Sequence, residues 1–119
     1  MKAIIVEPDA RPRVADIQSD LESLQEIVAG DIQVVYPFDD TVGIICNEEG
    51  KLLGLPLNRA LRDDNGEIFD ILCGTFLVVG LSEDDFTDLT DEQVDKYMKL
   101  YHSKEVFIRK GQRIISFAV

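Results

Sequence analysis

The chain has few of the residues from which catalytic and metal sites are usually built. It contains two cysteines, Cys46 and Cys73, a single histidine, His102, and no tryptophan. Two cysteines are too few for a disulfide framework, and their spacing matches no zinc motif. There is also no glycine-rich phosphate loop and no serine-centred nucleophile elbow. We therefore predict no catalytic residue, no metal site and no cofactor, and we interpret the cysteines as small core residues.

Positive charge is scarce as well. Twelve basic residues stand against 23 acidic ones, so the formal net charge is -11. This balance disfavours contact with phosphate backbones and anionic lipid, and we expect no direct nucleic-acid binding and no membrane binding. No apolar run approaches the roughly 20 residues of a membrane span, and the first residues form no signal peptide. We expect one cytoplasmic domain over residues 1–119.

The apolar pattern predicts both strands and helices. Apolar residues three and four positions apart predict an amphipathic helix over about 13–29, ended by Gly30. Thr90 and Gln93 have the spacing of a capping box and predict a second helix over about 91–102. Short apolar runs predict strands at 2–7, 32–38, 42–47, 51–53, 67–80, 106–109 and 113–119. Since most strands follow one another through short turns, we expect an α+β fold with a mostly antiparallel sheet and the first helix on one face. The alternative is a half-barrel wrapped round that helix.

The segment Gly54–Leu61, GLPLNRAL, is the first candidate site, and the pattern leaves its conformation open. The side chain of Asn58 both donates and accepts hydrogen bonds, and Arg59 presents a planar set of donors suited to carboxylate or phosphate. One hypothesis is the rim of a ligand pocket. The other, which the residues favour, is a loop fixed to the core by its leucines, with Arg59 neutralising an aspartate. The candidate ligand- or partner-binding residues are Asn58, Arg59, Pro56, Asp39 and Asp40.

An acidic stretch, Ser82–Asp95, is the second candidate site. Residues 63–103 carry 11 acidic and 2 basic side chains, whereas residues 104–119 carry 1 acidic and 4 basic ones. Carboxylates on a rigid surface can imitate DNA phosphates and occupy a nucleic-acid-binding protein. The other interpretation, which the residues favour, is a solvated helix entrance whose Phe86 and Leu89 fold inward and whose carboxylates only keep the protein in solution. The candidate residues of the acidic surface are Asp84, Asp85, Asp88, Asp91, Glu92 and Asp95.

Five segments together resemble one bacterial family. They are MKAIIVEP, VVYPFDD, ICNEEGKLLGLPLNRAL, GTFLVVG and LTDEQVDKYMKLYHSKEVF, and they extend from Met1 to about Phe107. They are similar to the domain-of-unknown-function family 3846. The resemblance implies a small accessory protein of Gram-positive bacteria, their conjugative elements or phages, and it implies a role for Asn58 and Arg59. It brings no assigned activity.

We therefore expect a non-enzymatic accessory protein that binds a protein partner through a surface that includes the acidic segment 63–103. DNA mimicry in counter-defence is one version of this hypothesis. The rival hypothesis is a small-ligand or nucleotide-binding domain that uses Gly54–Leu61, and an enzyme ranks third. The pattern does not indicate an oligomeric state.

Overall fold

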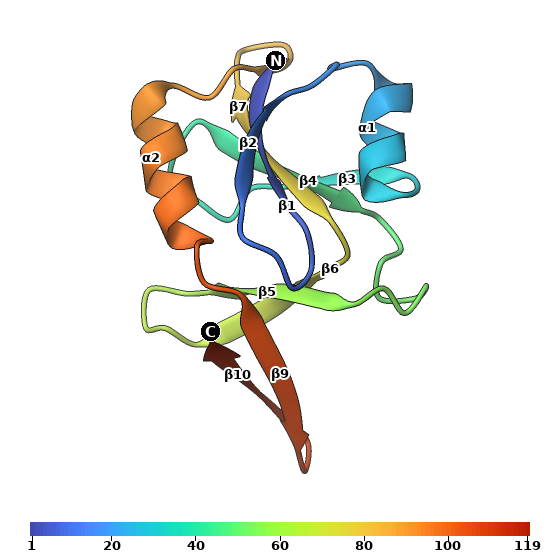
Figure 1. The fold of residues 1–119 in the computed structure, drawn as a ribbon, viewed down its shortest axis with the longest axis vertical. Coiled ribbons are helices and arrows are strands. Elements are labelled where there is room, and N and C mark those ends of the chain that lie inside the picture. Colours follow the sequence, from blue (N-terminus) through green and yellow to red (C-terminus); the bar gives the residue numbers. More distant parts are fainter.

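The computed structural model describes residues 1–119 and contains ten strands and two helices (Figure 1). The helices are α1 (Leu21–Val28) and α2 (Asp91–Leu100). The strands are β1 (Lys2–Val6), β2 (Arg13–Asp16), β3 (Ile32–Val35), β4 (Val42–Asn47), β5 (Leu57–Arg62), β6 (Ile68–Cys73), β7 (Phe76–Leu81), β8 (Phe86–Thr87), β9 (Glu105–Lys110) and β10 (Arg113–Ala118). Every strand pairing is antiparallel, which confirms the predicted α+β class with a mostly antiparallel sheet. Neither helix is long and apolar enough to cross a membrane.

The main sheet has six strands in the order β2-β1-β7-β4-β3, with β8 pairing to the end of β7. Its central strands β1, β7 and β4 are apolar at successive positions, so both of their faces must be covered. Helix α1 covers one face through Leu24 and Val28, as expected. The other face packs against α2 and the separate ribbon β5–β6, which contribute Leu61, Leu72, Tyr97 and Tyr101. The half-barrel alternative does not form, because this second layer occupies the face opposite α1.

The first helix is shorter than predicted. Residues 13–16 form the edge strand β2, and the helix begins only after Asp20, whose carboxylate accepts from the backbone N–H of Ser23 at 3.1 Å. Val14 is consequently 45% exposed. Apolar spacing of three and four cannot separate one long helix from a strand, a loop and a short helix. Residues 13–16 form a strand because β1 lies beside them and supplies backbone hydrogen-bonding partners. The local sequence pattern does not reveal this neighbouring strand. Ala29, not Gly30, takes the left-handed conformation at the helix end, with φ 63°.

Two other segments also differ from expectation. Residues 51–53, predicted as a strand, form turns in which the Leu53 N–H donates to the Glu49 carbonyl at 2.8 Å. Leu52 is 87% exposed, so no apolar contact draws this segment into a sheet. The predicted strand 67–80 is divided at Gly74, whose φ of 80° reverses the chain, and its halves β6 and β7 belong to different sheets.

The second helix is capped as predicted. The N–H of Gln93 donates to the Thr90 hydroxyl at 3.1 Å, and the N–H of Thr90 donates to the Gln93 side chain at 3.0 Å. The helix ends at Leu100, two residues before the predicted end, and His102 lies beyond it. The remaining strands, β9 and β10, form the predicted final hairpin, which projects from one end of the molecule (Figure 1).

Candidate functional site

The pair Asn58 and Arg59 lies inside the protein, with 1% and 2% of each residue exposed. In a regular strand, neighbouring side chains point to opposite faces. Here the register of β5 against β6 slips between Leu57 and Arg59, and such a bulge redirects a side chain. The Asn58 Nδ2 atom donates to the carbonyls of Val6 at 2.9 Å and Gly74 at 2.8 Å. The amide therefore joins β5 to the end of β1 and to the turn between β6 and β7.

The guanidinium group of Arg59 is held by neutral oxygens. Its Nη1 atom donates to Asn58 Oδ1 at 2.8 Å, and its Nη2 atom donates to the carbonyls of Ala10 at 2.7 Å and Tyr101 at 3.0 Å. Burial lowers the pKa of Arg59, and the charge of Glu105 opposes that shift although the two side chains form no ion pair. The expected neutralisation of an aspartate by Arg59 does not occur. The buried Nε atom has no hydrogen-bond partner.

A cavity of about 510 Å³ adjoins β5, the end of α2 and the base of the hairpin. Arg59 and Asp39 are the candidate residues that line it, whereas Pro56, Asn58 and Asp40 do not. Its other charged lining residues are Arg62, Asp64, Lys96 and Glu105. The wall therefore carries both signs of charge, and the five candidate residues do not form one rim.

Asp40 is bound within the fold. Its carboxylate accepts from the hydroxyl of Tyr97 at 2.8 Å, from the backbone N–H of Thr41 at 2.7 Å and from the Gln93 side chain at 3.3 Å. These contacts fasten the turn before β4 to helix α2. The hydrogen bond from Tyr97, followed by those from Thr41 and Gln93, holds the pKa of Asp40 below its ordinary value of 3.8.

This geometry predicts an acid-dependent loss of stability at Asp40. A carboxyl whose pKa is lower in the folded state stabilises the protein above its unfolded pKa and loses that contribution as pH falls through the folded value. We expect Asp40→Asn to be less stable than the wild type at pH 6, and the difference to shrink as pH falls from 4 to 3. Urea denaturation at each pH measures it. Asp39→Asn is the control, because Asp39 is exposed and makes no side-chain hydrogen bond. A difference for Asp40→Asn that is constant with pH would contradict the prediction.

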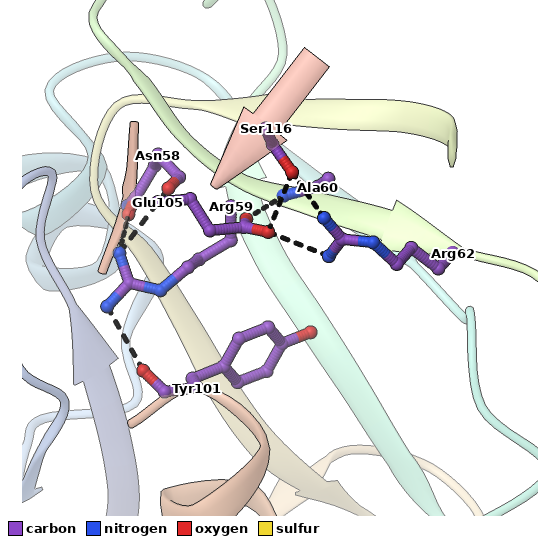
Figure 2. A network of polar contacts seen from close by, with 7 residues as sticks. All are labelled: Asn58, Arg59, Ala60, Arg62, Tyr101, Glu105 and Ser116. Carbon is purple, nitrogen blue, oxygen red and sulfur yellow. Dashed lines mark hydrogen bonds and ion pairs between the residues drawn. The ribbon is translucent and has the colours of Figure 1, made fainter. Parts of the chain in front are cut away.

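Glu105 anchors the hairpin to the body of the protein (Figure 2). Its side chain is 7% exposed and forms an ion pair with Arg62 at 2.7 Å. It also accepts from the backbone N–H of Ala60 at 2.5 Å and from the hydroxyl of Ser116 at 3.4 Å. A second hydrogen bond, from Arg62 to Ser116, closes the network. Strands β9 and β10 are thus both tied to β5 at the base of the hairpin.

One face of the hairpin is uncovered and apolar. Ile108 lies opposite Ile115, and Val106 lies opposite Phe117, so the four side chains share a face. Their exposed fractions range from 37% for Ile115 to 51% for Phe117. We call these four residues the apolar hairpin face.

The rest of the hairpin differs from this face. Lys110 and Arg113 lie opposite each other at the tip and, by strand alternation, on the same side as the apolar hairpin face. The other side carries the half-buried Glu105, Phe107 and Ser116 near the base, and the exposed Arg109 and Ile114 nearer the tip. The hairpin thus turns its polar base toward the body, whereas the apolar hairpin face and the tip cations point away from it.

The six candidate acidic residues are all exposed. They lie on the loops before and after β8 and on the first turns of α2, at the opposite end of the molecule from the hairpin (Figure 1). We call residues 82–95 the acidic end; it contains seven acidic residues and no basic one. Lys2 pairs with Asp91 at 3.3 Å, and its backbone N–H donates to Asp88 at 2.7 Å. Most of the carboxylates have no basic partner.

The remaining reactive side chains are dispersed. Cys46 and Cys73 are buried free thiols beside a second cavity of about 420 Å³, and burial raises the pKa of each. His102 is exposed, and its carbonyl accepts from Arg11 at 2.8 Å. No three His, Cys, Asp or Glu side chains are grouped so that they could hold a metal ion.

Sequence reasoning missed the apolar hairpin face and the role of Glu105. Apolar residues occur on both sides of the hairpin, so the sequence shows no clean alternation in 105–119. Only the strand register shows which four share an uncovered face. For Glu105, the available signal was that it is the single acidic residue in the basic tail 104–119.

Comparison with known proteins identifies the family. No curated protein and no solved structure matches the chain. A family model described as a domain of unknown function, DUF3846, matches residues 1–102. The match includes the main sheet, the ribbon β5–β6 and both helices, and it ends before β9. The chain therefore belongs to the DUF3846 family.

Proposed function

We propose that the protein is a non-enzymatic protein-interaction module and that the hairpin β9–β10 supplies its contact surface. The apolar hairpin face is the observation that carries the proposal. An isolated two-stranded hairpin is at best marginally stable in water, and here four large apolar side chains remain at least one-third exposed on it. A contiguous apolar patch bordered by charged groups is the usual composition of an interface centre with its rim.

The acidic end is the second contact region in this proposal. Its carboxylates are exposed and largely without basic partners, which suits a basic partner surface. DNA mimicry in counter-defence is a narrower version, and it predicts that capture of a DNA-binding protein weakens steeply with added salt. A role as a bacterial accessory protein, associated with a mobile element, rests on the family resemblance. The buried free thiols fit a reducing cytoplasm.

A host extract provides the test of the hairpin surface. The wild type and the double variant Ile108→Ser/Ile115→Ser would each serve as immobilised bait at equal loading. The matched control is Val14→Ser/Leu21→Ser, which removes two similarly exposed apolar residues from another surface. We expect at least one protein to bind the wild type and the control but not the hairpin variant. If every captured protein binds all three baits equally, the hairpin is not the contact surface. Thermal melting of each bait checks that it is folded.

Binding of a small ligand or nucleotide is the second candidate function. It is supported by the cavity of about 510 Å³, and Arg59, whose buried Nε atom has no hydrogen-bond partner, is one of its lining residues. A ligand that binds only the folded state raises the melting temperature, and the rise grows with the ratio of the free ligand concentration to the dissociation constant. A panel of nucleotides and carboxylic acids tests this function by thermal shift. Leu100→Trp should abolish the shift, because Leu100 is a half-exposed residue of the cavity lining.

A further inference from the structure

We infer that the apolar hairpin face and its tip cations bind the acidic end of a second copy of this chain, within a two-fold symmetric dimer. Each hairpin then lies against the acidic end of the other copy. The inference rests on the proposed function, since it names the partner of the surface proposed there.

Charge separation along the molecule is the first argument. Residues 104–119 carry four basic side chains and one acidic one, whereas the acidic end carries seven acidic side chains and no basic one. The single acid of the hairpin, Glu105, is already paired with Arg62 at its base. Lys110 and Arg113, at the tip, form no ion pair or side-chain hydrogen bond within the fold. The tip therefore presents two unneutralised cations beside an apolar face.

The position of the two regions favours contact between copies. The molecule is 43 Å long, and the hairpin and the acidic end lie at its opposite ends (Figure 1). The tip cannot reach the acidic end of its own chain. Two copies placed side by side in opposite directions bring each hairpin next to the other's acidic end. This arrangement makes two equal contacts and closes under two-fold symmetry, the commonest symmetry of protein dimers.

Net charge does not prevent this arrangement at physiological salt. Two copies with a net charge of -11 repel each other at long range. At about 0.15 M ionic strength, however, the screening length is about 8 Å, so groups in contact determine the electrostatic energy. At the acidic end the half-buried Phe86 lies among the carboxylates and offers apolar contact as well.

The hairpin is also held ready for binding. Its base is fixed to β5 by the contacts of Glu105 with Ala60 and Arg62, so little orientational freedom is lost when its outer face docks. The hairpin follows the residues matched by the family model, which end at 102. The hairpin thus lies outside the residues that the family model matches, and the acidic end lies within them.

The test reverses the charge of each surface in turn and measures dimerisation by analytical ultracentrifugation. Lys110→Glu/Arg113→Glu reverses the hairpin tip, and Asp91→Lys/Asp95→Lys reverses part of the acidic end. We expect the wild type to dimerise and each variant alone to dimerise at least about 10-fold more weakly. An equimolar mixture of the two variants should recover dimers, because in a mixed dimer the two altered surfaces meet at one contact and the two wild-type surfaces meet at the other.

A matched control uses the same charge change on the other helix. Glu22→Lys/Glu26→Lys replaces two exposed acids of α1 that lie four residues apart, like Asp91 and Asp95. We expect this control to dimerise at least as strongly as the wild type. Raising the salt from about 0.05 to 0.5 M should weaken the wild-type dimer by about 10-fold, because contact charges are then more strongly screened.

Two outcomes would overturn the inference. If the wild type stays monomeric at all concentrations, a second copy is not the partner. The host-extract test then decides the proposed function by itself. If dimers form but neither charge reversal weakens them, while Ile108→Ser/Ile115→Ser abolishes them, the hairpin binds a second hairpin instead of the acidic end. The proposed function fails separately, when the host-extract test finds no protein that binds the wild type and the control but not the hairpin variant.

Discussion

Replacing Arg59 with alanine is expected to lower the free energy of unfolding by about 3–5 kcal/mol. The substitution removes the donors that serve the carbonyls of Ala10 and Tyr101 and the side-chain oxygen of Asn58. Those oxygens are left unpaired in a water-poor region, and the lost side chain, 2% exposed as a residue, leaves a cavity. Since a domain of this size is stable by about 5–15 kcal/mol, the loss is a large part of the total. Urea denaturation of both proteins measures it.

Arg13→Ala is the control for this prediction. Arg13 forms an ion pair with Glu7 at 3.2 Å, but both side chains are about half-exposed, and such pairs contribute about 0–1 kcal/mol. We expect a change of about 0.5 kcal/mol or less. A loss of under 1 kcal/mol for Arg59→Ala would show that water replaces the guanidinium and that the site is open to solvent. If the expected loss is found, a missing thermal shift in Arg59→Ala does not by itself report on ligand binding, because the substitution also destabilises the fold.

Gly80→Ala is expected to lower the free energy of unfolding by about 3 kcal/mol. Gly80 lies on β7, where it pairs with Thr87 of β8. A Cβ atom at this position would lie 2.5 Å from the carbonyl oxygen of Asp88 and 3.0 Å from that of Thr87. Both are backbone atoms, so the clash is relieved only if β8 moves away from β7. Because β8 lies within the acidic end, that movement also displaces the proposed dimer surface.

Gly43→Ala is the matched control on the neighbouring strand. A Cβ at Gly43 would meet the ends of the Leu81 and Val34 side chains at 3.2 and 3.3 Å, and side chains can shift further than paired backbone. We expect a loss of about 1 kcal/mol or less. Equal losses for the two variants in denaturant titrations would contradict the argument. Hydrogen exchange at Phe86 and Thr87 gives a second measurement, and it should accelerate only in Gly80→Ala.

Several elements could be predicted from the sequence because short-range interactions determine them. Helix α2 begins where Thr90 and Gln93 cap each other, and these residues are three positions apart. The central strands are continuous apolar runs, and the last hairpin turns at Gly111, which is left-handed with φ 64°. Each signal is contained in a few neighbouring residues, so no knowledge of the rest of the chain is needed to read it.

The first helix shows where local reading fails. The apolar positions from Val14 to Val28 fit one helical face, yet only Leu24 and Val28 are buried there. Residues 13–16 pair instead with β1, about ten residues earlier in the chain. Helical and strand alternatives satisfy the same short pattern, and the choice depends on an available neighbouring strand. The conformation of residues 54–61 stayed open for the same reason, since β5 begins at Leu57 by pairing with β6, and the local pattern does not contain that partner.

By itself, the sequence determined the fold class, the capped helix, the strong negative charge and the basic tail, since composition and nearest neighbours specify these. The tertiary structure decided the rest. Asn58 and Arg59 are buried where they can bind backbone carbonyls of segments distant in sequence. Asn58 binds Val6, 52 residues away, and Arg59 binds Ala10 and Tyr101, 49 and 42 residues away. The apolar hairpin face is uncovered because the strand register places four apolar residues on the side that faces away from the body. The contacts of Asn58 and Arg59 join residues that are distant in sequence, so no local pattern encodes them.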